Sequence, residues 1–106
     1  MKLFLDDVRD APEGWTLVRP DNISYLMENA HLAEAISFDH DLGEMPNGEQ
    51  YSTGYDILTK LEALVRICDL WKGRPAPELT IHSANPVGVG RMKIVISNIY
   101  RYLEAN

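Results

Sequence analysis

The sequence predicts an α/β fold in which a mainly parallel sheet carries helices on its faces. Three short apolar runs, at residues 3–5, 35–38 and 79–81, indicate buried strands. Two longer stretches, at residues 53–71 and 88–103, carry apolar side chains at helical spacing. Because strands and helices alternate along the chain, we expect parallel strands joined by right-handed crossovers.

The chain before the central strand is expected to contain two strands and one helix. Strand 3–5 is followed by residues 8–14, in which no helical pattern occurs, and residues 15–19 indicate the second strand. Asp21 or Asn22 is expected to cap the helix that comes next. The apolar face of this helix consists of Ile23, Leu26, Met27 and Ala30.

The chain after the central strand is expected to form a loop, a long helix, a strand and a last helix. Residues 53–56 indicate a capping box at the start of the long helix, and Lys72-Gly73-Arg74-Pro75 is expected to end it. Its apolar face consists of Ile57, Leu58, Leu61, Leu64, Val65, Cys68 and Trp71. A strand at 79–82 comes next, and Asn85-Pro86 signals the last helix, which is expected to span about residues 88–103.

The polar segment at residues 42–52 is long for a connection in so small a domain, which is typical of a lid. Gly43, Pro46 and Gly48 disfavour regular structure in it. We expect this segment to be mobile in the free protein and to close over a bound ligand, with Tyr51 stacking on a base or sugar.

Length and composition indicate a single globular domain, residues 1–106. Of these residues, 45% are hydrophobic and 25% are charged, and no apolar run is long enough to span a membrane. Early carboxylates exclude a signal peptide, and the single Cys68 cannot form an internal disulfide, so a cytoplasmic location is expected. The net charge of −6 argues against bulk nucleic-acid binding, but it is compatible with a small phosphorylated ligand or an RNA terminus. The sequence does not indicate an oligomeric state.

Polar clusters follow the three apolar strands. Asp6-Asp7 comes after the first, Asp39-His40-Asp41 after the second and His82-Ser83-Ala84-Asn85 after the third. Ligands of an open parallel sheet bind outside the carboxyl ends of its strands, so we expect these side chains to converge. Neighbouring carboxylates repel one another unless a cation offsets the repulsion. The pattern therefore predicts a site for Mg²⁺ or Mn²⁺ held by Asp6, Asp7 and Asp39.

Several segments together resemble the cyclic-phosphate processing receiver family, a divergent branch of the response-regulator receiver domains. These segments are Leu5-Asp6-Asp7-Val8-Arg9-Asp10-Ala11-Pro12, Gly14-Trp15, Val18-Arg19, Phe38-Asp39-His40-Asp41-Leu42-Gly43, Thr53-Gly54-Tyr55-Asp56 and His82-Ser83-Ala84-Asn85-Pro86-Val87-Gly88. The resemblance covers nearly the whole chain. It implies a truncated, flavodoxin-like receiver fold with four strands in the order 2-1-3-4. It also implies processing of a cyclic phosphate of a nucleotide or an RNA end.

Two differences from regulatory receivers favour chemistry over signalling. A regulatory receiver needs a lysine after a fifth strand, but Lys60, Lys72 and Lys93 lie on expected helices or at a helix end. The chain instead has two imidazoles, His40 and His82, at strand ends. Histidine is the natural general acid or base near neutral pH.

Three functions fit these residues. The first is a metal-dependent phosphoesterase, in which His40 or His82 moves a proton and Arg9 neutralises charge on the phosphate. The second is a covalent enzyme, in which Asp39 is the nucleophile and Asp41 the acid of an aspartyl-phosphate reaction. The third is a non-catalytic receiver-like module that binds a partner or a phosphorylated ligand.

The candidate residues also have structural interpretations. Thr53, Ser83 and Asn85 are candidates for substrate contact, but each can instead cap a helix. His40 can point into solvent from between two aspartates, and His82 can be a hydrogen-bonded core residue. The carboxylates can simply end strands and stabilise turns.

Overall fold

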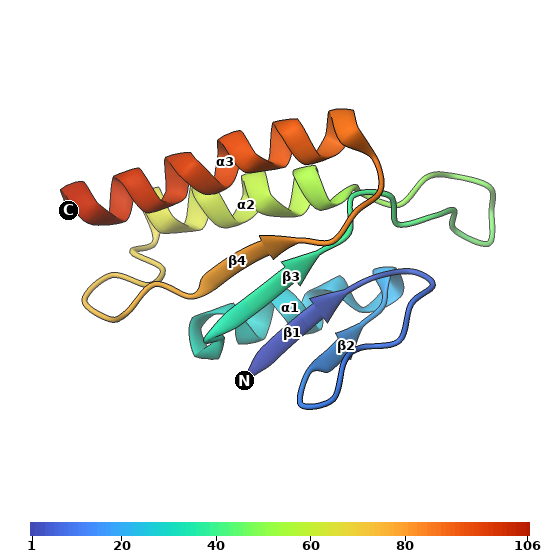
Figure 1. Cartoon of the computed structure of the whole chain (residues 1–106), viewed down its shortest axis with the longest axis horizontal. Coiled ribbons are helices and arrows are strands. Elements are labelled where there is room, and N and C mark those ends of the chain that lie inside the picture. Colours follow the sequence, from blue (N-terminus) through green and yellow to red (C-terminus); the bar gives the residue numbers. More distant parts are fainter.

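Four parallel strands form one sheet in the order β2-β1-β3-β4 in the computed structural model, which describes residues 1–106 (Figure 1). The strands are β1 (Lys2–Leu5), β2 (Thr16–Val18), β3 (Ala35–Phe38) and β4 (Glu78–Ile81). All three neighbouring pairs are parallel. The predicted α/β class, strand direction and strand order are therefore confirmed.

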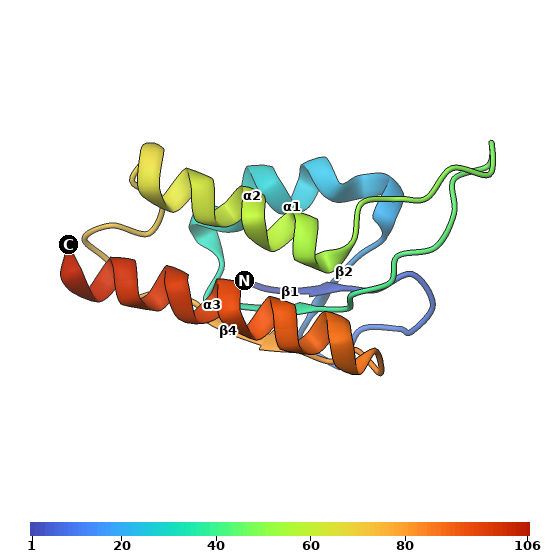
Figure 2. The same cartoon turned by 90° about the horizontal axis from the view of Figure 1, so that it is seen from above.

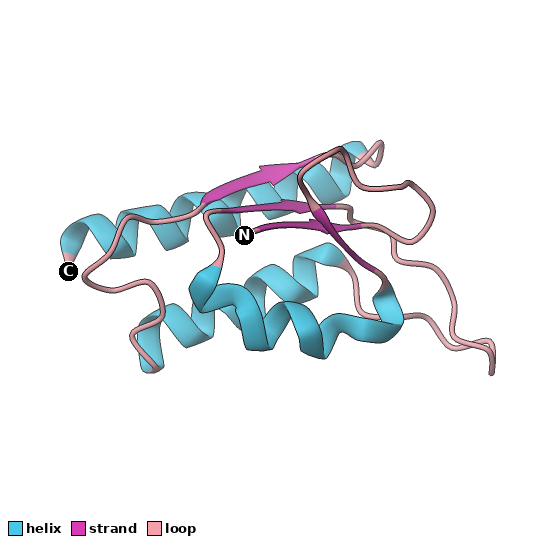
Figure 3. Cartoon of the chain, turned by 90° about the horizontal axis from the view of Figure 1, so that it is seen from below, coloured by secondary structure: helices cyan, strands magenta, loops and turns pink.

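Three helices are arranged unequally around this sheet. They are α1 (Ile23–Asn29), α2 (Gly54–Ile67) and α3 (Pro86–Ala105). Helices α1 and α2 cover one face, and α3 runs alongside β4 and packs on α2 (Figures 2 and 3). No helix covers the opposite face of the sheet. None of the helices has the length and apolar character that crossing a membrane requires.

The hydrophobic core lies between the sheet and these helices. Alternate strand residues point into it, because successive side chains of a strand face opposite sides. The largest fully buried side chains are Leu3, Leu5, Val18, Ile36 and Phe38 from the strands, Leu26, Ile57, Leu58, Leu61 and Val65 from α1 and α2, and Met92 and Ile99 from α3. The same strands carry polar side chains just beyond their last buried residues, so the core holds the candidate site in place.

Two helix boundaries differ from the predictions. A 3₁₀ turn, Pro20–Asn22, precedes α1, and neither Asp21 nor Asn22 caps the helix through its side chain. Helix α3 begins at Pro86 instead of about residue 88, because Asn85 caps it by accepting a hydrogen bond from the Gly88 N–H.

The end of α2 was also predicted wrongly. The helix ends at Ile67, so Cys68 is exposed and Trp71 lies beyond the helix. Trp71 is still buried, and its Nε1–H donates to the carbonyl oxygen of Ala30 over 2.8 Å. Its φ of +64° shows that this contact is made by a turn and not by a continued helix.

The segment at residues 42–52 forms a narrow finger. Glu44 and Gln50 make an antiparallel bridge, and the Met45 N–H donates to the Glu49 carbonyl over 2.6 Å. The finger extends past the carboxyl ends of the strands, away from the body of the domain (Figures 1 and 2). Its mobility and closure over a ligand stay predictions.

Candidate functional site

Two carboxylates and an imidazole meet where three strands end. Asp6 follows β1, Asp39 follows β3 and His82 follows β4. Their potential ligand atoms all lie within 4.8 Å of one another. The register of the sheet explains this meeting, because Leu5, Phe38 and Ile81 are paired across the three strands. These three residues therefore form the centre of the candidate site.

Asp6 is buried and bonded at both carboxylate oxygens. Its Oδ1 accepts the backbone N–H groups of Val8 and Arg9, each over 2.7 Å, and its Oδ2 lies 2.9 Å from His82 Nε2. Burial by itself would raise the pKa of Asp6, but the hydrogen bonds from Val8, Arg9 and His82 outweigh it and hold the pKa below its ordinary value. Asp6 is therefore a fixed negative charge at neutral pH.

The imidazole of His82 is held at both ring nitrogens and on one ring face. Nδ1 lies 2.7 Å from the hydroxyl oxygen of Ser37, and Nε2 faces Asp6. The ring stacks on Phe4 with a centroid distance of 4.1 Å and an interplanar angle of 7°. Because a hydroxyl can donate or accept, Ser37 satisfies either neutral tautomer of the ring.

Sequence reasoning missed Ser37, although a signal for it exists. Ser37 is the one polar residue in the apolar run of β3, and it is buried. A buried hydroxyl needs a hydrogen-bond partner, and the partner here comes from a strand end 45 residues away. Ser37 and Asp6 thus hold His82 between them.

Asp39 carries unrelieved negative charge. Its Oδ1 accepts the backbone N–H of His40 over 2.8 Å, and no protein group donates to its other oxygen. Burial, followed by the charges of Asp6 and Asp7, raises the pKa of Asp39 above its ordinary value despite this bond and the nearby His82. A cation at this position would relieve the repulsion, so the residues present fit a divalent metal ion.

Asp7 and Arg9 lie at the edge of this centre. Asp7 is outside the group of closely spaced ligand atoms, but its charge acts on Asp39. Arg9 is exposed, and its Nη1 donates to the carbonyl oxygen of His82 over 3.2 Å. Arg19, named above only within a segment of the family resemblance, supports the loop after β1 by donating to the carbonyls of Asp6 and Arg9.

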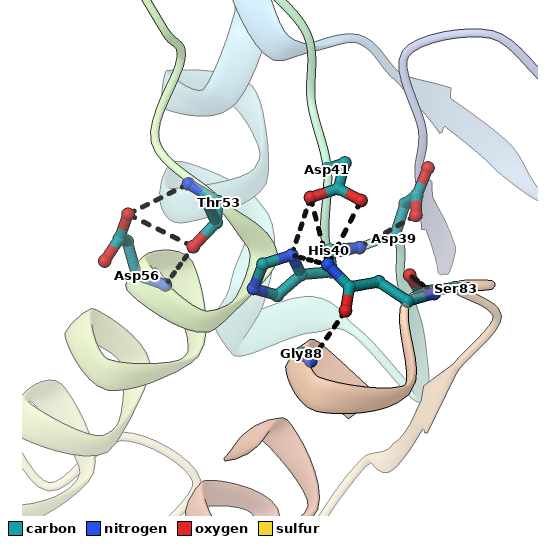
Figure 4. A network of polar contacts seen from close by, with 8 residues as sticks. Asp39, His40, Asp41, Thr53, Asp56, Ser83 and Gly88 are labelled. Atoms are coloured by element: carbon teal, nitrogen blue, oxygen red, sulfur yellow. Dashed lines mark hydrogen bonds and ion pairs between the residues drawn. The ribbon is translucent and has the colours of Figure 1, made fainter. Parts of the chain in front are cut away.

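His40 belongs to a second polar cluster (Figure 4). Its Nδ1 lies 2.8 Å from Asp41 Oδ1, and Asn85 Nδ2 donates to both oxygens of Asp41, over 3.3 and 3.5 Å. The ring points away from the Asp39 carboxylate and lies against Gly88, where a Cβ would overlap it. The hydrogen bond from His40 lowers the pKa of Asp41, against a smaller opposing effect of burial. The cluster ties the loop after β3 to the start of α3.

Three further candidates have structural roles at helix starts: Thr53 and Asn85 cap helices, and Ser83 bonds the capping residue Asn85. Thr53 Oγ1 accepts the Asp56 N–H, and the Asp56 carboxylate accepts the Thr53 N–H, which completes the predicted capping box. The hydroxyl of Ser83 accepts the N–H of Asn85 over 3.1 Å. The structure thus gives Thr53, Ser83 and Asn85 structural partners, and their contact with a substrate stays a prediction.

Residues 1–98 of the chain match the family model described as the cyclic-phosphate processing receiver domain. The chain belongs to this family. Comparison with curated proteins and with solved structures gave no match. The resemblance carried by residues 39–43 and 82–86 is thereby confirmed. Both segments contribute to the candidate site of this receiver domain, Asp39 from the first and His82 from the second.

Replacement of Ser37 by alanine tests the support of His82. The Ser37→Ala variant leaves the partly buried Nδ1 of His82 without a protein partner, so we expect a loss of about 1–2 kcal/mol in the free energy of unfolding. Urea denaturation measures this loss. Ser97→Ala, which changes an exposed serine of α3, is the matched control and is expected to change stability little. Equal stability of the two variants would contradict the role of Ser37.

Replacement of Asp39 by asparagine tests the charge repulsion. A carboxyl group whose pKa is raised in the folded state stabilises the fold at low pH and loses that contribution as pH rises. The Asp39→Asn variant is therefore expected to melt above the wild type at pH 7 in chelator, and the difference should shrink as pH falls toward 4. Thermal melts across this range measure it. A lower midpoint for the variant at pH 7 would count against the repulsion.

Proposed function

We propose that this domain hydrolyses a cyclic phosphodiester of a nucleotide or RNA end to a phosphomonoester, with a divalent cation bound at the site. The observation that carries the proposal is the imidazole of His82, held by Asp6 and Ser37 beside the unpaired oxygen of Asp39. A proton carrier next to a cation-binding carboxylate is the minimum that opening a phosphate ring at neutral pH requires. The family assignment agrees with this chemistry.

The carboxylates of Asp6 and Asp39, with Asp7 beside them, would hold the cation. His82 is close enough to be a third ligand, but one imidazole nitrogen cannot bind a metal and carry a proton at the same time. Because Nε2 of His82 already faces Asp6 Oδ2 at hydrogen-bond distance, we assign proton transfer to His82. Oxygen ligands suit Mg²⁺ and Mn²⁺. Such a cation, when bound, polarises phosphoryl oxygens and lowers the pKa of water.

Three side chains of the protein would have separate roles in opening the phosphate ring: His82 transfers the proton, and Asp6 and Arg9 stabilise charge. Because a cation on the Asp6 carboxylate would offset the charge that Nε2 of His82 faces, the imidazole could then carry its proton on Nδ1, donated to Ser37, with Nε2 as the acceptor. In this tautomer, water attacks phosphorus and loses a proton to Nε2, and one ester P–O bond of the phosphate ring breaks. The same nitrogen returns the proton to the departing alkoxide oxygen, so the ring opens to a phosphomonoester and a hydroxyl group. Asp6 stabilises the transient imidazolium. Arg9, exposed at the rim, is placed to neutralise charge on the phosphate oxygens.

The geometry gives less support to a phosphorylation switch or a covalent mechanism at Asp39. No lysine follows any of the four strands directly. Asp41, the acid that the covalent mechanism needs, is bonded to His40 and Asn85. The His40 ring itself points away from Asp39, so we assign His40 a positioning role.

Hydrolysis of a panel of cyclic phosphates tests the proposal. We expect phosphomonoester formation from at least one nucleoside 2′,3′-cyclic phosphate with Mg²⁺ or Mn²⁺, and none in chelator. A parallel incubation with beryllofluoride tests for an acyl-phosphate acceptor. Beryllofluoride capture at Asp39 without turnover of any cyclic phosphate would replace the proposed hydrolase by a receiver-like binding module.

A further inference from the structure

Two adjoining cavities open between the candidate site and the finger. The smaller one, of about 380 Å³, reaches Asp7 and Arg19, and the larger one, of about 640 Å³, lies under the finger. The two share Pro20, Asp21 and Tyr51. Of the acidic residues of the candidate site, Asp7 is the one that lines these cavities, so a ligand held at the site would pass Asp7 and Tyr51 to reach the larger cavity.

The base of the finger connects these cavities to the carboxylates. The Tyr51 N–H donates to the Gly43 carbonyl over 3.0 Å, so the two residues face each other where the finger begins and ends. Gly43 has a φ of +80°, and a Cβ there would lie 3.2 Å from Asp7 Oδ2. Tyr51 is therefore bonded to a residue, Gly43, that itself lies next to the carboxylate of Asp7.

The lining of the larger cavity combines apolar surfaces with a polar rim. Its apolar part comes from Tyr51, Met45, Ile23 and Ile57. Its polar part includes Asp21, Asn47 and Lys60. Asn47 Oδ1 accepts the Glu49 N–H, which leaves its amide N–H₂ group free to donate. The volume falls in the range of small-molecule pockets, and a flat ring with hydrogen-bonding edges matches this lining.

We infer that the larger cavity binds the nucleobase of the substrate, so that the domain acts on nucleoside cyclic phosphates and not on small cyclic phosphates in general. The inference rests on the proposed function for the position of the phosphate. Tyr51 supplies the stacking surface, and Asn47 and Asp21 supply a donor and an acceptor for the base edge or the ribose. The net charge of −6 favours a mononucleotide or a terminal nucleotide over an extended strand.

Ligand binding in the presence of Mg²⁺ tests this inference independently of turnover. The probes are adenosine 3′-monophosphate, a ring-opened nucleotide, and glycerol phosphate, which lacks a base. Two-dimensional NMR of the wild type should show resonance changes at Met45, Tyr51 and Ile57 with the nucleotide only. The nucleotide should bind at least tenfold more tightly than glycerol phosphate. A tenfold difference in affinity is about what one base stacked on an aromatic side chain contributes.

Variants of Tyr51 test whether its aromatic ring causes the preference for the nucleotide over glycerol phosphate. Tyr51→Leu keeps an apolar side chain but removes the ring, and it should abolish the preference for the nucleotide. Tyr51→Phe keeps the ring and should preserve that preference. Equal affinity of the wild type for both probes, or resonance changes confined to the carboxylates, would overturn the inference even if cyclic phosphates are hydrolysed. Nucleotide binding in the cavity without turnover of any cyclic phosphate would support it and contradict the proposed hydrolase.

Discussion

Replacement of His82 by glutamine is expected to lower kcat for cyclic-phosphate hydrolysis by about 10²- to 10⁴-fold, the usual contribution of a general acid or base. Glutamine can still bond Asp6 and Ser37, but it cannot accept and return a proton near neutral pH. The fold should survive, because the change keeps a polar side chain of similar size at a partly buried strand end. Initial rates at saturating substrate measure the effect.

The matched control for this variant is His31→Gln. His31 is an exposed residue of the 3₁₀ turn Ala30–Leu32, which comes before β3 and so lies at the opposite end of the sheet. Its replacement should leave both kcat and the melting midpoint unchanged. If His82→Gln kept the rate of the His31→Gln control, His82 would not be the proton carrier.

Replacement of Gly54 by alanine is expected to have the largest effect on stability. A Cβ at Gly54 would overlap the backbone carbonyl oxygen of Asp39 and press on the side chain of Met92. Met92 can adjust, but a backbone carbonyl at the end of a buried strand cannot. We expect a loss of about 3 kcal/mol and a fall of about 10–20 °C in Tm. The displaced Asp39 should also weaken metal binding.

Gly90→Ala is the control for this substitution. Gly90 lies in α3, and a Cβ there would meet no atom within 4 Å. Because alanine favours a helix more than glycine does, this variant should gain about 0.5–1 kcal/mol. Thermal melts of the two variants are expected to shift in opposite directions. A Gly54→Ala protein as stable as the wild type would show that α2 does not pack closely on the loop after β3.

The predicted fold was most accurate where the apolar pattern alone decides the structure. Each buried strand has only four residues or fewer and stops at a polar cluster, so its end could be placed closely. The end of α2 could not, because Cys68 and Trp71 continue the helical spacing of apolar residues. The helix instead ends at Ile67, Asp69 takes a positive φ, and the turn brings Trp71 to Ala30, a residue 41 positions away that the local sequence does not indicate.

The site was predictable in position but not in detail. Asp6, Asp39 and His82 each come first after a strand, and position alone brings them together. The direction of His40 depends on a bend after β3 and on its contacts with Asp41 and Gly88, so it appears only in the folded chain. Ser37 depends on a partner 45 residues away, so its contact appears only in the folded chain.

Phosphorus-31 NMR of a nucleoside 2′,3′-cyclic phosphate mixed with the protein and Mg²⁺ tests the central claim most directly. We expect the resonance of the cyclic phosphate to be replaced by that of a phosphomonoester. Asp39→Asn and His82→Gln should each remove this conversion, while His31→Gln should retain it. Conversion that persists in both site variants, or a wild-type protein that binds Mg²⁺ at the site and leaves the panel of cyclic phosphates intact, would contradict the claim.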